Sequence, residues 1–188
     1  MRVITGSLKG RRIQAVRGDY TRPTTDKIKE SIYNILGQYF DGGCVLDLFA
    51  GSGNLGIEAI SRGMSHAVFI DHNIFAIKTI KNNLIHLEIV DKAEVYQYDA
   101  FKALHLLAKK QDTFDLIFLD PPYKKTVLSE LLDIIITKGL LNHKGRVVCE
   151  FGVGINVVYD EKILKILRCQ NYGTTQILIL EKVATNNE

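Results

Sequence analysis

Residues 45–56 read VLDLFAGSGNLG, and this stretch decides the fold that the sequence predicts. A short apolar run leads directly into a loop with glycine at positions 51, 53 and 56. The glycines match the pattern G-x-G-x-x-G, in which a buried strand ends in a loop whose backbone approaches a nucleotide. The stretch therefore predicts the first strand of a Rossmann-like, doubly wound α/β sheet.

Further apolar runs follow, and amphipathic segments separate them. The predicted strands are 44–49, 66–71, 93–98, 114–120 and 145–151, and the predicted helices are 54–62, 73–87, 101–110 and 126–138. Near-continuous apolar strands that alternate with helices are typical of βαβ units and of a parallel sheet covered on both faces. Two later runs, 162–170 and 174–182, flank a tight turn and predict a terminal antiparallel hairpin.

The N-terminal region has a different pattern. Residues 1–6 and 11–16 predict a β-hairpin, and a helix is predicted after Pro23, ending at Gly42 and Gly43. Residues 1–31 carry eight basic and three acidic side chains, a net charge of +5 in a chain whose total is +3. This basic segment indicates a polyanionic partner, although a solvated surface can have the same composition.

Composition excludes several classes of protein. The 188 residues are 46% hydrophobic, which is typical of a globular chain, and no apolar stretch is long enough to span a membrane or to form the core of a signal peptide. The three cysteines are an odd number without a C-x-x-C pair, and the five histidines lack the spacing of metal ligands. We therefore expect a cytoplasmic protein with no disulfide framework, no metal and no membrane partner.

An acidic residue ends each of three successive predicted strands: Asp47, Asp71 and Asp99. A carboxylate at Asp47 suits a cationic ligand and repels a pyrophosphate, which favours S-adenosylmethionine over a dinucleotide. Asp71 is placed to bind a ribose, and Asp99 lies where an adenosine could bind. The alternatives are that these acids only cap the following helices, or that the loop serves a nicotinamide-dependent oxidoreductase. Three acids around one glycine loop weigh against simple capping.

Residues 118–125 read FLDPPYKK, and the predicted strand before them stops at two prolines. Proline cannot continue a sheet ladder, so the chain turns with a carboxylate and a phenol at the bend. The exocyclic amine of a base is a poor nucleophile, because its lone pair is delocalised, and it needs acceptors that orient its N–H groups. Asp120 and a carbonyl of the Pro121–Pro122 turn are the predicted acceptors, and Tyr123 is predicted to stack on the base. A dehydrogenase has no use for this motif.

These stretches together resemble a known family. The opening MRVITGSLKGRRI, the segment TRPTTDKIKESIYNIL, the loop region VLDLFAGSGNLGIEAISRG, FID and DPPY resemble class I S-adenosylmethionine-dependent methyltransferases. More closely, the chain is similar to the RsmD family of bacterial 16S rRNA guanine-N2 methyltransferases. The similarity covers essentially the whole chain. The glycine loop alone indicates only the methyltransferase superfamily, whereas the opening together with RPTTDKIKE indicates the RsmD family within it.

The resemblance implies a seven-stranded, mostly parallel sheet with an antiparallel last strand. It implies methyl transfer from S-adenosylmethionine to the N2 amine of guanine-966 in 16S rRNA, within an assembled or assembling small ribosomal subunit. It also implies that the RPTTD segment lies near the cofactor. We accordingly divide the chain into a basic hairpin and helix, 1–41, that binds RNA and covers the cofactor, and a methyltransferase domain, 42–188.

Three sets of site residues are predicted. The catalytic set is Asp120, Pro121, Pro122 and Tyr123. The cofactor-binding set is Arg22, Thr24, Asp47, Phe49, Gly51, Gly53, Asp71, Asp99, Ala100 and Phe101. The nucleic-acid-binding set is Arg2, Lys9, Arg11, Arg12 and Arg17. Helix capping explains Thr24 and Thr25 as well as ligand contact does, and core burial explains Phe101 as well as packing on adenine does.

Other functions fit parts of the same pattern. A DNA or tRNA amino-methyltransferase would use the same motifs, because a basic segment suits any polyanion. A catalytically inactive nucleic-acid-binding module is a further alternative, which the intact Asp47, glycine loop and Asp120 oppose.

Overall fold

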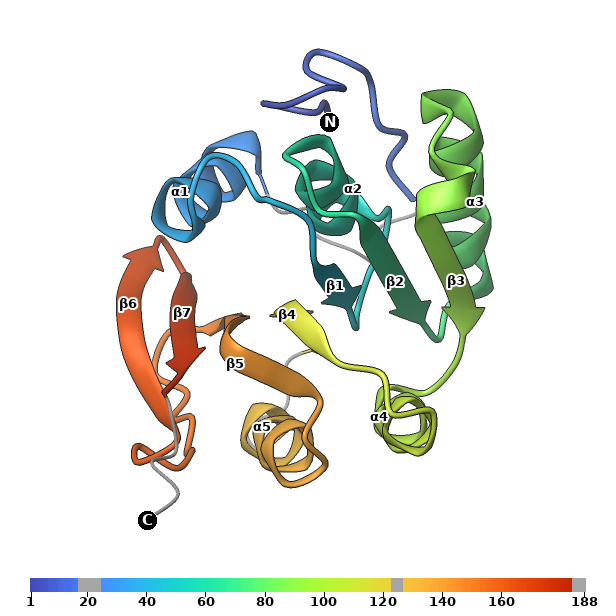
Figure 1. The fold of residues 1–188 in the computed structure, drawn as a ribbon. Helices are drawn as coiled ribbons and strands as arrows, with labels where there is room; N and C mark the ends of the chain where they lie inside the picture. Colours follow the sequence, from blue (N-terminus) through green and yellow to red (C-terminus); the bar gives the residue numbers. More distant parts are fainter. Residues whose placement is uncertain (17–24, 123–126, 184–188) are drawn as a thin grey trace. The chain divides into compact units, whose positions relative to one another are not determined.

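The structure, a computed structural model, describes residues 1–16, 25–122 and 127–183. Its strands form a seven-stranded sheet of order β3-β2-β1-β4-β5-β7-β6 (Figure 1). The predicted fold class, a mostly parallel doubly wound sheet that ends in antiparallel strands, is confirmed. The chain forms two compact units, Met1–Ala100 and Phe101–Glu188.

The first unit contains three parallel strands, which are β1 (Cys44–Asp47), β2 (His66–Asp71) and β3 (Ala93–Gln97). Its helices are α1 (Asp26–Leu36), α2 (Asn54–Ser61) and α3 (Ile74–Leu87), and a short 3-10 turn, η1 (Val90–Lys92), precedes β3. In the register of β1 and β2, Asp47 lies opposite Phe69, so Asp71 follows two residues beyond that pair. The ends of both strands therefore lie at one edge, as the sequence predicts.

The helix α1 is shorter than the sequence predicts. Thr25 caps its first turn, because the threonine hydroxyl accepts a hydrogen bond from Ile28 N. The helix ends at Leu36, since Gly37 has φ +111°, and the predicted end at Gly42 and Gly43 is wrong. Capping is thus observed for Thr25, whereas Thr24 lies outside the described residues.

The N-terminal residues 1–16 form only a minimal hairpin. A single antiparallel bridge joins Arg2 and Arg12, and the hydrogen bonds of Val3 N to Arg11 O and of Ile13 N to Met1 O extend it. A two-stranded hairpin of this size is marginal alone, so its position depends on what it packs against. Its apolar side chains Val3 and Ile13 are buried.

The second unit contains β4 (Phe114–Leu119) paired in parallel with β5 (Leu141–Gly152). The last two strands, β6 (Leu164–Tyr172) and β7 (Thr175–Lys182), pair with each other in antiparallel order, and β7 also pairs antiparallel with β5. The predicted terminal hairpin is therefore confirmed. The helices are α4 (Ala100–Lys109), which begins at the last residue of the first unit, and α5 (Val127–Thr137). Within the described ranges, no helix is long and apolar enough to cross a membrane.

Candidate functional site

Two glycines of the G-x-G-x-x-G pattern lie in the loop between β1 and α2 and the third lies in the first turn of α2, and each is needed for a different reason. Gly51 has φ +54°, and a Cβ added there would meet no atom of the described residues within 4 Å. Gly53 has φ +79°, and its Cβ would lie 3.3 Å from Ile57 Cδ1 and Phe69 Cε1. A Cβ on Gly56 would lie 2.4 Å from Phe69 Cε1. The open space beside the loop is therefore at Gly51, whereas Gly53 and Gly56 are required by backbone conformation and by helix–strand packing.

Asp71 holds this loop in place. Its Oδ2 accepts a hydrogen bond from Gly51 N at 2.8 Å, and its Oδ1 accepts one from Asn73 N at 2.8 Å. The cap of α3 is Asn73, whose side chain accepts from Phe75 N. Asp71 is therefore not the helix cap. It connects the loop after β1, through Gly51, with the loop after β2, through Asn73. A carboxylate has about four acceptor sites, so Asp71 keeps acceptor capacity for a further hydroxyl group.

Asp47 lies buried at the end of β1. Its Oδ2 accepts a hydrogen bond from Gly56 N at 3.1 Å, and Gly56 is in the first turn of α2. This carboxylate thus satisfies an N–H that the helix cannot pair internally, while the N-cap residue, Gly53, has no side chain to do so. Burial raises the pKa of Asp47 to about 7; the Gly56 hydrogen bond opposes this rise, and the charge of Asp71 adds to it.

The pKa of Asp47 predicts a pH dependence of stability. A carboxyl group whose pKa rises on folding stabilises the protein below its unfolded pKa, and this contribution is lost as pH rises through the folded pKa. We expect the Asp47→Asn variant, which keeps an acceptor for Gly56 N, to gain stability relative to the wild type by on the order of 2 kcal/mol between pH 5 and pH 7. Urea unfolding of both proteins across this range measures the difference, and a constant difference would contradict the shift.

The remaining predicted cofactor residues occupy the ends of strands or the starts of helices. Phe49 is half-buried in the loop after β1. Asp99 is exposed directly before α4, Ala100 is buried at its first position, and Phe101 is half-buried and belongs to the second unit. The packing of Phe101 on adenine stays a prediction. Arg22 and Thr24 lie outside the described residues.

The DPPY motif directly follows β4 in the second unit. Asp120 is exposed, Pro121 is buried and Pro122 is exposed, whereas Tyr123 lies outside the described residues. The strand ends at Leu119, one residue before the motif. The strand therefore ends one residue earlier than predicted, and Asp120 is exposed directly after it.

The predicted nucleic-acid residues of the N-terminal hairpin are on the surface. Arg2, Lys9, Arg11 and Arg12 are exposed, and Arg17 lies outside the described residues. Arg11 donates from Nη2 to His86 O, near the end of α3, at 2.7 Å, and Arg2 Nε lies 3.7 Å from Asp26 Oδ2. The guanidinium of Arg11 thus helps to hold the hairpin on α3, whereas Lys9 and Arg12 are the better choices for testing charge alone.

A buried charged cluster under the hairpin was missed by the sequence analysis. Glu58 of α2 accepts from Ile4 N and Lys29 Nζ on Oε2, at 2.8 and 3.0 Å. On Oε1 it accepts from Thr5 N and Arg62 Nε, at 3.0 and 2.8 Å. The side chains of Lys29 and Glu58 are fully buried. One glutamate therefore joins the N-terminal segment, α1 and α2.

Aromatic contacts complete this cluster. The Arg62 guanidinium lies over the Tyr33 ring, 4.4 Å from its centroid, and Tyr33 donates its hydroxyl hydrogen to Leu55 O. The signal in the sequence was a charged residue, Glu58, inside an apolar helical stretch, with an arginine four positions later. The pattern does not reveal that a lysine from another helix pairs with it.

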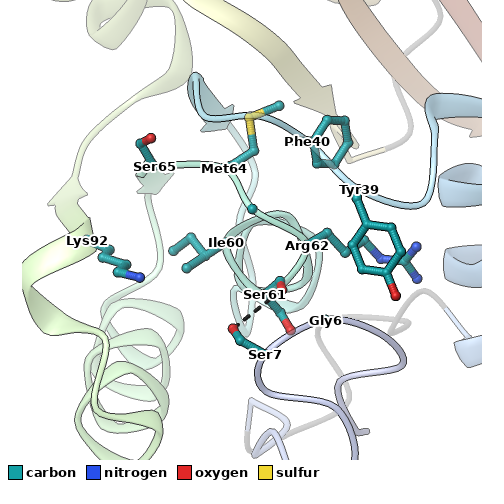
Figure 2. Close-up of a pocket in the computed structure, with 11 residues that line it drawn as sticks. Gly6, Ser7, Tyr39, Phe40, Ile60, Ser61, Arg62, Met64, Ser65 and Lys92 are labelled. Carbon is teal, nitrogen blue, oxygen red and sulfur yellow. Dashed lines mark hydrogen bonds between the residues drawn. The ribbon is translucent and has the colours of Figure 1, made fainter.

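A shallow hollow of about 630 Å³ lies at the C-terminal end of α2 (Figure 2). Its lining includes Tyr39, Arg62 and Lys92, and also Ser7 and Ser61, between which the Ser7 hydroxyl donates to Ser61 O. Among the predicted site residues that the structure describes, none lines this hollow. It is therefore separate from the glycine loop, which lies at the other end of α2.

The glycine loop and the mixed sheet define the class of protein, a Rossmann-like methyltransferase fold. The structure titled "Putative methyltransferase yhhF from Escherichia coli" is similar with a TM-score of 0.84 and 28% identity, covering 98% of this chain and 99% of that one. An RNA methyltransferase from Salinibacter ruber in complex with S-adenosyl-L-homocysteine has a TM-score of 0.65 and covers 89% of this chain and 97% of that one. Its 18% identity supports the shared fold alone.

The chain belongs to the RsmD family, whose model, described as "Conserved hypothetical protein 95", matches residues 1–181. A relative from Bacillus subtilis, "Putative rRNA methyltransferase YlbH", is 50% identical and covers 97% of this chain and 99% of its own length. The Escherichia coli protein named "Ribosomal RNA small subunit methyltransferase D" is 30% identical over 80% of this chain and 74% of its own length. The resemblance drawn from the sequence is thereby confirmed.

Proposed function

We propose that the protein transfers a methyl group from S-adenosylmethionine to the exocyclic N2 amine of a guanine in 16S rRNA, at position 966 in the usual rRNA numbering. Membership of a family whose relatives are named as rRNA methyltransferases supports the reaction class. The observation that carries the proposal is the glycine loop, with open space at Gly51 and two carboxylates around it.

The residues of the first unit fit this cofactor. When bound, S-adenosylmethionine supplies an electrophilic methyl group on a cationic sulfur. Open space at Gly51 lets a ligand approach the loop backbone, and Asp71 retains acceptor capacity for a ribose hydroxyl. Asp47 has a pKa near neutrality, so a nearby cationic ligand would favour its ionised form. A dinucleotide would bring a pyrophosphate against the same carboxylates, which opposes that alternative.

The proposed catalytic residues of the second unit act on the amine. Asp120 and a carbonyl of Pro121 or Pro122 accept hydrogen bonds from the two N–H groups, and Tyr123 stacks on the base. The amine lone pair is then oriented for attack, and orientation of this kind supplies a large part of a rate enhancement. The two prolines keep the acceptors rigid, because each fixes its own φ.

The experiment that tests the function identifies the methylated nucleoside. The protein is incubated with labelled S-adenosylmethionine and, separately, with 16S rRNA, small ribosomal subunits, tRNA and DNA, and the product is digested to nucleosides. We expect N2-methylguanosine from rRNA or from the subunit. Label in tRNA or DNA alone would support the alternative amino-methyltransferases. Cofactor binding without transfer to any of the four would support the inactive binding module.

Because the N-terminal hairpin has exposed basic side chains, we expect its affinity for RNA to depend on salt concentration. The Lys9→Gln/Arg12→Gln variant should bind every RNA sequence more weakly and lower the slope of log affinity against log salt by up to about two units, because each phosphate contact releases a counterion. Binding isotherms at several salt concentrations measure this slope.

A control variant distinguishes loss of phosphate contacts at the hairpin from a lower net positive charge of the whole protein. Lys138→Gln/Lys162→Gln removes two exposed lysines of the second unit, outside the predicted site residues, and should leave the slope unchanged. If the hairpin variant and the wild type give parallel lines of equal affinity, the hairpin does not bind phosphates.

A further inference from the structure

Asn83 on α3 is completely buried and joins two segments that are far apart in the sequence. Its Oδ1 accepts a hydrogen bond from Gln14 N at 2.8 Å, and its Nδ2 donates to Gln14 O at 3.0 Å. The second hydrogen of Nδ2 goes to Ser52 O at 2.9 Å. The amide therefore links the end of the N-terminal hairpin with the glycine loop, and both of its donor hydrogens are used.

Lys29 makes a second link, between the hairpin and the first residue of α2. Its Nζ lies 2.7 Å from Arg2 O in the hairpin and 2.7 Å from Asn54 Oδ1, which directly follows the glycine loop. Glu58 is the third acceptor, so all three ammonium hydrogens have a partner. A buried amide and a buried ammonium therefore each contact both the hairpin and the loop region.

The hairpin depends on these links because its own ladder is so short. The N–H groups of Ile4 and Thr5 donate to Glu58, and that of Leu8 donates to Ser61 Oγ. A shift of the loop would break hydrogen bonds to Asn83 or Lys29 in a buried environment, where an unpaired polar group costs more than in water. The loop and the hairpin are thus expected to become ordered together.

We propose that Asn83 is a positioning residue that couples the cofactor loop to the basic hairpin, so that S-adenosylmethionine and RNA raise each other's affinity. A ligand that orders the loop fixes Ser52 O, and through the Asn83 amide it fixes Gln14 and the hairpin. A second ligand on the hairpin then binds a segment that is already ordered and loses less conformational entropy. Such coupling is reciprocal, so RNA must raise the cofactor affinity by the same factor. The RNA half of this inference rests on the proposed function.

The first experiment needs no RNA. Amide hydrogen exchange is measured on the wild-type protein with and without S-adenosylhomocysteine. We expect slower exchange at Ile4, Thr5 and Gln14 when the ligand is bound, although it binds at the loop. If the ligand slows exchange only in the loop and its flanking strands, the inference is overturned. This test uses the wild-type protein alone, so it does not depend on whether any variant folds.

The second experiment compares ligand affinities. In the wild type, saturating RNA should raise the affinity for S-adenosylhomocysteine by about fivefold or more, and the ligand should raise RNA affinity equally. In Asn83→Leu, a side chain of similar size without hydrogen-bonding groups, the factor should fall toward one, because only the Lys29 link remains, while each ligand alone still binds. The matched control is Asn82→Leu, an exposed neighbour on the same helix, which should retain the wild-type factor.

The possible outcomes are distinct. If no RNA binds, the proposed function is contradicted. The hydrogen-exchange experiment then decides whether the loop and the hairpin are coupled. Binding of both ligands without mutual effect in the wild type would overturn the coupling and leave the proposed function intact. An unchanged factor in Asn83→Leu would overturn the role of Asn83.

Discussion

Replacing Asp120 by alanine lowers kcat on the best RNA substrate by about 10²-fold or more, whereas affinity for S-adenosylmethionine stays within about twofold. The reason is that the proposed role of Asp120 is to orient the target amine. Loss of this acceptor removes an interaction that matters at the reacting atoms, not one that holds the cofactor. Single-turnover kinetics and calorimetry measure the two quantities separately.

Two further variants sharpen the test of Asp120. Asp120→Asn keeps one acceptor oxygen and should retain more activity than Asp120→Ala. Asp133→Ala removes an exposed carboxylate from α5 in the same unit and should leave kcat unchanged. A near-normal kcat for Asp120→Ala would exclude the assigned role, and an equal loss of cofactor affinity would assign Asp120 to cofactor binding.

Glu58→Ala lowers the free energy of unfolding by about 3–5 kcal/mol, the range measured when one partner of a buried ion pair is removed. The variant leaves two buried cations, Lys29 and Arg62, without their shared counter-charge. It also leaves the N–H groups of Ile4 and Thr5 without an acceptor. Burial already lowers the pKa of Lys29, and loss of the Glu58 charge would lower it further. Urea unfolding measures the loss.

The control for Glu58 is Glu30→Ala, an exposed carboxylate on α1, which should change stability by less than about 0.5 kcal/mol. If Glu58→Ala does not fold, Lys29→Met provides a second measurement, because it leaves Glu58 paired with Arg62. We expect its loss to be smaller than that of Glu58→Ala. A loss below about 1 kcal/mol in Glu58→Ala would mean that the cluster contributes little to stability.

The elements of the fold could be predicted because their signals are local. A strand buried on both faces, such as 114–119, has to be a continuous apolar run, and the helices between such strands have to be amphipathic. The glycine loop was recognisable for the same reason, since its pattern extends over six residues. The predicted end of α1 is too late, because Tyr39 continues the apolar spacing of Ile35 and Leu36 beyond Gly37, where the helix stops.

The site was predictable in its residue types but not in its hydrogen bonds. The sequence predicts that the three strand-end acids contact different parts of one ligand, but it does not predict their protein partners: Asp47 accepts from an N–H of α2, Asp71 accepts from two loops and Asp99 is exposed. These differences arise from the partners that each carboxylate meets. A carboxylate in a sequence does not specify which backbone N–H group will face it after folding.

The class of fold, the place of the glycine loop and the family could all be predicted from the sequence, because each depends on short apolar runs or on contiguous motifs. The burial of Lys29, Glu58 and Asn83, and their hydrogen bonds from α1, α2 and α3 to the N-terminal hairpin, become visible only in the folded protein. Their partners lie far away in the chain, with 69 positions between Gln14 and Asn83 and 54 between Ile4 and Glu58. A polar residue can be buried only where folding supplies its hydrogen-bonding partners, so no local pattern in the sequence predicts such a position.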